Sequence, residues 1–326
     1  MSTILGIETS CDETGVAVVR DGHTILANEV ASQIARHARF GGVVPEIASR
    51  AHTEVISQLC ARALDDAGRP NIDAIAATIG PGLLGSLFVG VSFAKALAMS
   101  LDVPFIPVHH LEGHLLSPFL SGEPAQFPFL ALIVSGGHTS LFECTTFGEY
   151  HELGATRDDA VGESFDKVAR LLNLGYPGGP ALQRAADSGD PRAYDFPRGM
   201  AHGASFEFSY SGLKTAVLYT LQATPNASPT DVAASFQTAA VDVLIQKTLA
   251  ALKATGAPRL VVAGGVAANR LLRERLESEI PVPVLIPPIA LCTDNAAMIA
   301  AAGWHRYEAG ARGDLSSSPE PSLVLK

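Results

Sequence analysis

A pattern of apolar strand, short polar turn and second strand occurs twice in this chain of 326 residues. The strands of the first copy cover residues 4–8 and 16–19, and those of the second cover residues 129–134 and 140–145. The first turn holds Asp12 and Glu13 among hydroxyl side chains, and the second holds two adjacent glycines. Two copies of one pattern predict an internal duplication, and therefore a fold with two related parts.

The first part also contains the pattern of a parallel crossover. A strand at 72–79 leads through a glycine-rich turn into an apolar helix at 86–100, and a further strand follows at 103–108. Strands that are joined through a helix pair in parallel. The turn Asp21-Gly22 adds an antiparallel strand before this unit. We therefore expect mixed sheets in an α/β fold.

Composition limits the class of protein. Hydrophobic residues make up 47% of the chain and charged residues 17%, which is enough for two cores of ordinary size. The net charge of −10 argues against broad binding of nucleic acid, although a local basic face stays open. We find no apolar run of about 18 uncharged residues and no signal-peptide pattern, so a cytoplasmic protein that avoids the membrane is expected.

The cysteines indicate neither a disulfide framework nor a thiolate zinc site. Four are present, and no two of them form a CxxC pair. We expect reduced thiols at all four positions, Cys11, Cys60, Cys144 and Cys292.

Three histidines follow the strand at 103–108, in the stretch Pro107-Val-His-His-Leu-Glu-Gly-His114. On a helix, His110 and His114 would lie one turn apart on the same face, which suits a metal ion. Glu112 would lie about 200° around the helix from His110, so the stretch is not the HExxH motif of zinc proteases. The alternative is a pair of ordinary core or surface histidines. A metal site needs a third ligand, for which Asp294 in the sequence Cys292-Thr-Asp-Asn295 is the candidate.

The glycine turn centred on Gly136 predicts a phosphate-binding loop, because glycine lets the backbone approach an anion closely, although an ordinary hairpin turn would also explain it. The run from Gly264 to Asn269, between a strand and a helix, predicts a nucleotide-binding loop, although lone glycine pairs are common. The glycine turn at Gly179 is placed to hold the hydroxyls of a ligand through its backbone. Lys214 is expected in the first turn of a helix, where its charge opposes the helix dipole and requires an anion nearby. The tail from Ala311 has the composition of a mobile segment.

The motifs as a set resemble the tRNA N6-adenosine threonylcarbamoyltransferases, the bacterial TsaD/Gcp family. The resemblance covers nearly the whole chain, through GIETSCDET, GGVVPEIASR, GPGLLGSL, HHLEGH, VSGGHT, DDAVGESFDK, YPGGP, FSYSGLKT, AGGVAANR and CTDN. It implies an actin-like ATPase (ASKHA) fold, in which two related α/β lobes hold a nucleotide in a cleft between them. The lobes would be residues 1–125, completed by a C-terminal helix at about 296–326, and residues 126–295.

The resemblance also implies the site. His110, His114 and Asp294 would bind one divalent metal ion, iron in the first place and zinc in the second. Asp12 is the candidate base that takes a proton from the acceptor amine. The adenylate would be held by eight residues of the second lobe, namely Ile133, Val134, Ser135, Gly136, Gly137, Asp166, Gly179 and Asn269.

The implied reaction passes the threonylcarbamoyl group of threonylcarbamoyl-AMP to N6 of the adenosine beside the anticodon, in tRNAs that read codons starting with A. AMP is released. The implied partners are tRNA, a smaller paralogous actin-like subunit that forms a heterodimer, and a small P-loop ATPase.

Three other functions compete with this interpretation. A kinase or chaperone-like ATPase would hold Mg²⁺ through carboxylates and would not need the histidine pair. A metalloprotease would need Glu112 beside the metal, which its helical phase disfavours. A non-catalytic subunit that only supports a complex would be expected to lack the three metal ligands, and this chain keeps them.

Overall fold

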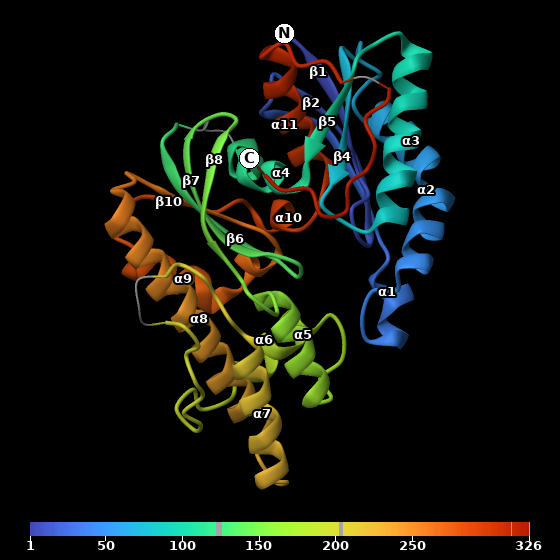
Figure 1. Ribbon diagram of the computed structural model, residues 1–326. Helices are drawn as coiled ribbons and strands as arrows, with labels where there is room; N and C mark the ends of the chain where they lie inside the picture. The colour runs from blue at the N-terminus through green and yellow to red at the C-terminus, as the bar shows by residue number, and fades with distance from the viewer. Residues whose placement is uncertain (122–125, 202–204, 314, 326) are drawn as a thin grey trace. The chain divides into compact units, whose positions relative to one another are not determined.

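The computed structural model describes residues 1–121, 126–201, 205–313 and 315–325 (Figure 1). The chain divides into two compact units. The first consists of Met1–Ala125 together with Thr293–Lys326, and the second consists of Gln126–Cys292.

The first unit is built on a five-stranded mixed sheet of order β3-β2-β1-β4-β5. Strand β1 pairs antiparallel with β2 and parallel with β4, as the hairpin and the crossover patterns predict. The strands are β1 (Thr3–Glu8), β2 (Glu13–Arg20), β3 (Thr24–Ser32), β4 (Ala74–Gly80) and β5 (Phe105–His109).

Helices cover both faces of this sheet (Figure 1). On one face α2 (Pro45–Asp66) and α3 (Leu84–Leu101) pack on a core that includes Leu5 and Ile7 of β1. On the other face lies α11 (Ala296–Glu308), which contacts β1, β2 and β4. The short helices of the unit are α1 (Ile34–His37), η1 (Ala38–Phe40), α4 (His110–Leu116) and η2 (Ser117–Ser121).

Helix α11 lies unusually close to β1. A Cβ atom on Gly6 would come within 2.7 Å of the backbone nitrogen of Ala300, and a Cβ on Gly15 within 2.9 Å of that of Ala296. Only glycine permits this approach. The close packing fixes the start of α11, and with it the segment that carries Asp294.

The second unit repeats the topology of the first. Its sheet has the order β10-β9-β6-β7-β8, in which β6 pairs antiparallel with β7 and parallel with β9. Strands β6 to β10 therefore correspond one by one to β1 to β5, and the predicted duplication is confirmed. The strands are β6 (Phe129–Val134), β7 (Thr139–Thr146), β8 (Glu149–Ala155), β9 (Leu260–Ala263) and β10 (Val284–Leu285).

The helices of the second unit enclose its main core, which is centred on α8 (Pro229–Thr255). Phe165 of α5 meets Phe236 of α8 edge to face, with ring centroids 5.2 Å apart. The remaining helices are α5 (Val161–Leu171), α6 (Gly178–Ala186), α7 (Ser211–Ala223), η3 (Gly265–Ala268), α9 (Arg270–Glu279) and α10 (Ile289–Cys292).

The C-terminal tail differs from the sequence expectation of a mobile segment. The backbone N–H of Glu320 donates to the carbonyl of Ile79, and that of Gly82 donates to the carbonyl of Pro321. Lys95 of α3 donates to the carbonyl of Leu315 at 2.8 Å. These bonds hold the tail along the turn that follows β4.

Helix α3 is the one helix in the described part of the chain that is long and apolar enough to cross a membrane. A single helix of this kind is weak evidence for a membrane span. It packs on β4 and α2, as a core helix of an α/β unit does.

Candidate metal centre and anion-binding loops

Helix α4 begins where β5 ends, and His109 forms its N-cap. The Nδ1 atom of His109 accepts a hydrogen bond from the Leu111 N–H at 3.1 Å, and its Nε2 lies 3.1 Å from the carbonyl of Leu323 in the tail. Burial lowers the pKa of His109 to about 4, which keeps Nδ1 available as an acceptor. His109 is therefore a structural residue, consistent with its exclusion from the expected ligand set.

The other two histidines meet Asp294. One ligand atom from each of His110, His114 and Asp294 can be chosen so that all three lie within 4.8 Å of one another. The Asp294 Oδ1 atom lies 3.1 Å from His114 Nε2 and 3.6 Å from His110 Nε2. Both rings are buried, whereas the Asp294 side chain is 21% exposed. The predicted third ligand is thus next to the predicted pair.

The side chains of this group fit a metal ion. Both ring nitrogens of His114 are buried and make no hydrogen bond with the described residues, and Nε2 has only its 3.1 Å contact with Asp294. A buried polar atom without a partner costs about 1–3 kcal/mol, so such an atom calls for a ligand. Two imidazole nitrogens and a carboxylate oxygen are donors that suit iron or zinc and leave coordination positions open. The group could hold a metal ion.

Glu8, at the end of β1, contacts the Nδ1 atom of His110, the ring nitrogen other than the one nearest Asp294. Its Oε2 atom lies 3.1 Å from His110 Nδ1 and accepts a 2.6 Å hydrogen bond from the Thr78 hydroxyl, while Oε1 accepts one from the Ser10 N–H. Burial raises the pKa of Glu8, but the charge and hydrogen bond of His110 outweigh it, and the net pKa is lowered. Burial likewise lowers the pKa of His110, but Glu8 and Asp294 together raise it to about 9.

Further carboxylates gather beside this group. Burial, followed by the charges of Asp12 and Asp294, raises the pKa of Glu13 to about 9. The same causes raise the pKa of the Cys11 thiol. The negative charges of Asp12 and Asp294 thus both disfavour the ionised form of Glu13. A cation bound here would relieve their mutual repulsion.

Glu112 points away from the metal group, as its helical phase predicts. It is fully buried, and its Oε2 accepts a 2.5 Å hydrogen bond from Arg306 Nε of α11. A glutamate held in this way is not placed to activate a metal-bound water. The protease interpretation therefore loses its key residue.

In the second unit, two glycines bring their segments against the loop of Ser135, Gly136 and Gly137. A Cβ on Gly162 would lie 2.6 Å from the Ser135 carbonyl oxygen, and one on Gly264 would lie 2.7 Å from the Val134 carbonyl carbon. Gly136 and Gly137 are exposed, and their backbone N–H groups donate to no described residue. Both remain available to an anion.

Hydrogen bonds connect the other predicted nucleotide residues in sequence. Asp166 Oδ1 accepts from the Gly178 N–H at 2.7 Å, which sets the start of α6 beside Gly179. Gln183 of α6 accepts from the Arg270 N–H at 2.8 Å, at the start of α9. Asn269 caps α9, because its Oδ1 accepts from the Leu272 N–H. A side chain of α5 therefore holds the start of α6, and a side chain of α6 holds the start of α9.

Asn269 is more constrained than the sequence suggested. Its Oδ1 is used by the cap and its Nδ2 donates to Gln237 Oε1 at 2.9 Å. Its side chain is thus bound within the fold, and it orients α9.

Sequence reasoning missed Glu8 and left the partner of Lys214 unidentified. Glu8 was not distinguished from the other residues of its strand, although a carboxylate at the end of an apolar strand was a usable signal. Lys214 was expected to need an anion, and the structure identifies it: Asp159 bonds both Lys214 at 2.9 Å and Lys167 at 2.6 Å.

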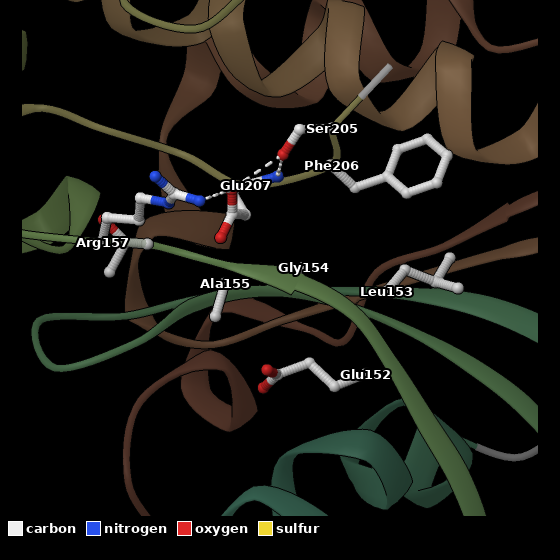
Figure 2. A pocket seen from close by; sticks show the side chains of 9 residues that line it. Glu152, Leu153, Gly154, Ala155, Arg157, Ser205, Phe206 and Glu207 are labelled. Carbon is white, nitrogen blue, oxygen red and sulfur yellow. Dashed lines mark hydrogen bonds and ion pairs between the residues drawn. The ribbon is translucent and has the colours of Figure 1, made fainter.

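A pocket of about 400 Å³ lies elsewhere in the second unit, beside β8 (Figure 2). Its lining comes from residues 152–157 and 205–207, and an ion pair between Arg157 and Glu207 closes one side. None of the predicted site residues lines it.

Solved structures with a similar fold define the class of protein. Full-length HypF, in its phosphate- and nucleotide-bound form, matches with a TM-score of 0.64 and 14% identity, over 95% of this chain and 47% of that chain. Component A of (R)-2-hydroxyglutaryl-CoA dehydratase from Acidaminococcus fermentans matches with a TM-score of 0.55 and 15% identity. The match covers 94% of this chain and 100% of that chain. Fold and site together define an actin-like α/β protein with a histidine-histidine-aspartate group in its first unit.

Sequence comparison identifies the family within this class. The family model of the tRNA N6-adenosine threonylcarbamoyltransferases (TsaD) matches residues 24–301. The protein of that name from Trichlorobacter lovleyi is 54% identical over 322 residues, which cover 96% of this chain and 94% of the relative. The protein of the same name from Bacillus cereus is 52% identical over 333 residues, which cover 99% of this chain and 96% of the relative. The chain belongs to the tRNA N6-adenosine threonylcarbamoyltransferase family.

Proposed function

We propose that this chain transfers the threonylcarbamoyl group from threonylcarbamoyl-AMP to N6 of the adenosine beside the anticodon, in tRNAs that read codons starting with A. Family membership over residues 24–301 is the observation that carries the proposal. It makes the chain a transferase that acts on tRNA. The convergence of His110, His114 and Asp294 supports it independently.

The proposed reaction is acyl transfer from a mixed anhydride. The N6 amine attacks the carbamoyl carbon, the bond from that carbon to the phosphate oxygen breaks, AMP leaves, and a proton is lost from the amine. The exocyclic amine of adenine is a weak nucleophile. The protein must therefore orient the two reactants, polarise the carbonyl and remove the proton.

We assign one divalent metal ion to His110, His114 and Asp294, with iron first and zinc second. A divalent ion held there would supply Lewis-acid polarisation of a carbonyl or phosphoryl oxygen. The charges of Asp12 and Asp294 both raise the pKa of Glu13 and of the Cys11 thiol, which supports a role for Asp12 near this group. Asp12 is our candidate for the base that accepts the proton from N6.

We assign the adenylate to the second unit. The free N–H groups at Gly136 and Gly137 suit a phosphate, in a loop that Ile133, Val134 and Ser135 position. Asp166 has the chemistry for ribose hydroxyls. The exposed backbone near Gly179 would contact the nucleoside. Asn269 would contribute to adenylate binding indirectly, because its N-cap bond to the Leu272 N–H orients α9.

The partners in this proposal are tRNA, a smaller paralogous actin-like subunit and a small P-loop ATPase, in the cytoplasm. Helix α3 offers a surface for the paralogous subunit. Leu84, Phe88 and Met99 are 47%, 49% and 66% exposed and fall within about 60° of one another around the helix axis. Exposed apolar residues gathered on one helix face are typical of protein interfaces. Phe88→Asp should abolish binding of that subunit and leave the fold intact.

Transfer of label tests the function directly. Threonylcarbamoyl-AMP that carries radiolabelled threonine is incubated with unmodified tRNA, the partner subunits and this chain. Label should enter tRNA only when this chain is present, and it should not enter a tRNA whose target adenosine is replaced by guanosine. Label that enters both tRNAs equally, or that needs no chain, would contradict the proposal.

A further inference from the structure

Glu8 makes contacts that decide which nitrogen of His110 carries the proton. Its carboxylate is fully buried at the end of β1, and Oε2 lies 3.1 Å from His110 Nδ1. A carboxylate oxygen only accepts, and the Ser10 hydroxyl, 3.2 Å from the same nitrogen, can accept as well, so the proton of a neutral His110 belongs on Nδ1. The lone pair is then on Nε2, the nitrogen that lies 3.6 Å from Asp294 Oδ1.

We propose that Glu8 is a positioning residue that fixes the His110 tautomer and adds a second buried negative charge to the metal group. This inference rests on the metal site of the proposed function and adds a residue behind its ligands. Carboxylates that accept from the far nitrogen of a ligand histidine tune metal affinity in many proteins.

The orientation of Glu8 is itself determined by the neighbouring backbone. The Ser10 N–H donates to Oε1 at 2.5 Å, and a backbone N–H has no other role than donor. Thr78, on the adjacent strand β4, donates its hydroxyl to Oε2. Each oxygen of Glu8 therefore has a defined place.

These contacts make the isosteric change Glu8→Gln unusually informative. The Ser10 N–H requires an acceptor at the Oε1 position, so the amide oxygen of glutamine must lie there. Its NH₂ group then takes the Oε2 position and donates to His110 Nδ1. This reverses the tautomer, and a proton on Nε2 blocks the nitrogen that faces Asp294. A change of one atom should thus impair the metal group without altering its shape.

The negative charge of Glu8 also supports its role beside the metal group. Among the described residues, His110 is the only cationic partner within ion-pair distance of Glu8. A buried carboxylate without a lysine or arginine needs another compensating charge. A divalent ion near Glu8 and Asp294 supplies two positive charges for two carboxylates.

Binding of Co²⁺ to the metal-free full chain tests the inference through the visible absorption of the ion. Glu8→Gln should raise the Kd about 10- to 100-fold. Glu207→Gln is the matched control, because it makes the same change in a glutamate of the second unit that pairs with an arginine, Arg157, and its Kd should equal that of the wild type. Equal affinity of wild type and Glu8→Gln would overturn the role of Glu8. A wild type that binds no Co²⁺ would contradict the metal site itself.

A second measurement needs no variant. In the Zn²⁺-loaded wild type with ¹⁵N-labelled histidine, NMR should show His110 bound to the metal through Nε2 and carrying a proton on Nδ1. Coordination through Nδ1, or a Nδ1 without a proton, would overturn the inference.

Discussion

Arg306 of α11 donates a 2.5 Å hydrogen bond to the fully buried carboxylate of Glu112 on α4. Helix α4 carries both histidines of the candidate metal group, and helix α11 begins two residues after Asp294. The ion pair therefore connects the two segments that bring the three ligands together. The glutamate within the histidine stretch thus has a structural partner on α11.

Breaking this pair should weaken both the fold and the metal group. Glu112→Ala leaves Arg306 without its partner, and the pair is partly screened because the Arg306 side chain is 34% exposed. We expect a loss of about 1–3 kcal/mol in the free energy of unfolding. Urea denaturation measures it. The double variant Glu112→Ala with Arg306→Met should recover part of the loss, and an additive loss would contradict the coupling.

The contact between β1 and α11 gives a second prediction. Gly6→Ala forces a Cβ toward the backbone of α11 and should cost about 1–3 kcal/mol of stability by overpacking. It should also weaken metal binding, because Asp294 precedes α11. Gly42→Ala is the control, since a Cβ at Gly42 meets no atom within 4 Å. Thermal unfolding of the two variants compares them, and equal stability would count against the close packing.

The loop of Ser135, Gly136 and Gly137 in the second unit gives a third prediction. Gly162 and Gly212 are each the second residue of a helix, α5 and α7. A Cβ at Gly162 would meet Ser135 and Gly136, whereas a Cβ at Gly212 meets nothing within 4 Å. Gly162→Ala should therefore lower AMP affinity at least tenfold, about 1.4 kcal/mol, by calorimetry. Gly212→Ala should bind AMP like the wild type. A normal affinity for Gly162→Ala would remove this loop from the nucleotide site.

The charges around Asp159 predict a pH dependence. Burial raises the pKa of Asp159, but Lys167 and Lys214 outweigh it, and the net pKa lies below the ordinary value of 3.8. A lowered pKa of an acid stabilises the fold above its unfolded pKa, and this contribution is lost as the pH falls through the folded value. Lys214→Met should therefore cost up to about 1 kcal/mol at pH 7. The difference from wild type should shrink toward pH 3; a difference independent of pH would refute the ion pair.

The fold was predictable where local pattern decides it. Apolar strands and glycine turns predicted the central strands of both sheets and their duplication, because strand periodicity and turn chemistry act within a few residues. Strand β8 was not predicted. The stretch Asp158-Asp-Ala-Val-Gly-Glu-Ser-Phe-Asp-Lys167 predicts a helix from about Asp158, but helix α5 begins at Val161. The reason is that Asp158 is used elsewhere: it accepts hydrogen bonds from the N–H groups of Tyr210 and Ser211 at the start of α7. Such a partner, more than fifty residues away, leaves no local signal.

The candidate site also has a part that local sequence predicts and a part that depends on long-range contacts. The spacing of His110 and His114 follows from helix geometry and could be predicted from six residues. The role of Glu8 depends on a contact across 102 positions, which only the assembled sheet creates. The tail shows a similar limit, because its composition indicated mobility while the backbone bonds of Glu320 and Pro321 hold it to the turn after β4.

The most direct measurement of the central claim is label transfer to unmodified tRNA by metal-depleted protein, before and after Fe²⁺ or Zn²⁺ is added back, with all partner subunits present. We predict that depletion abolishes transfer, that one equivalent of metal restores it, and that His110→Ala stays inactive at the same metal concentration. Transfer by the depleted protein, or by His110→Ala at the wild-type rate, would contradict a metal-assisted transferase.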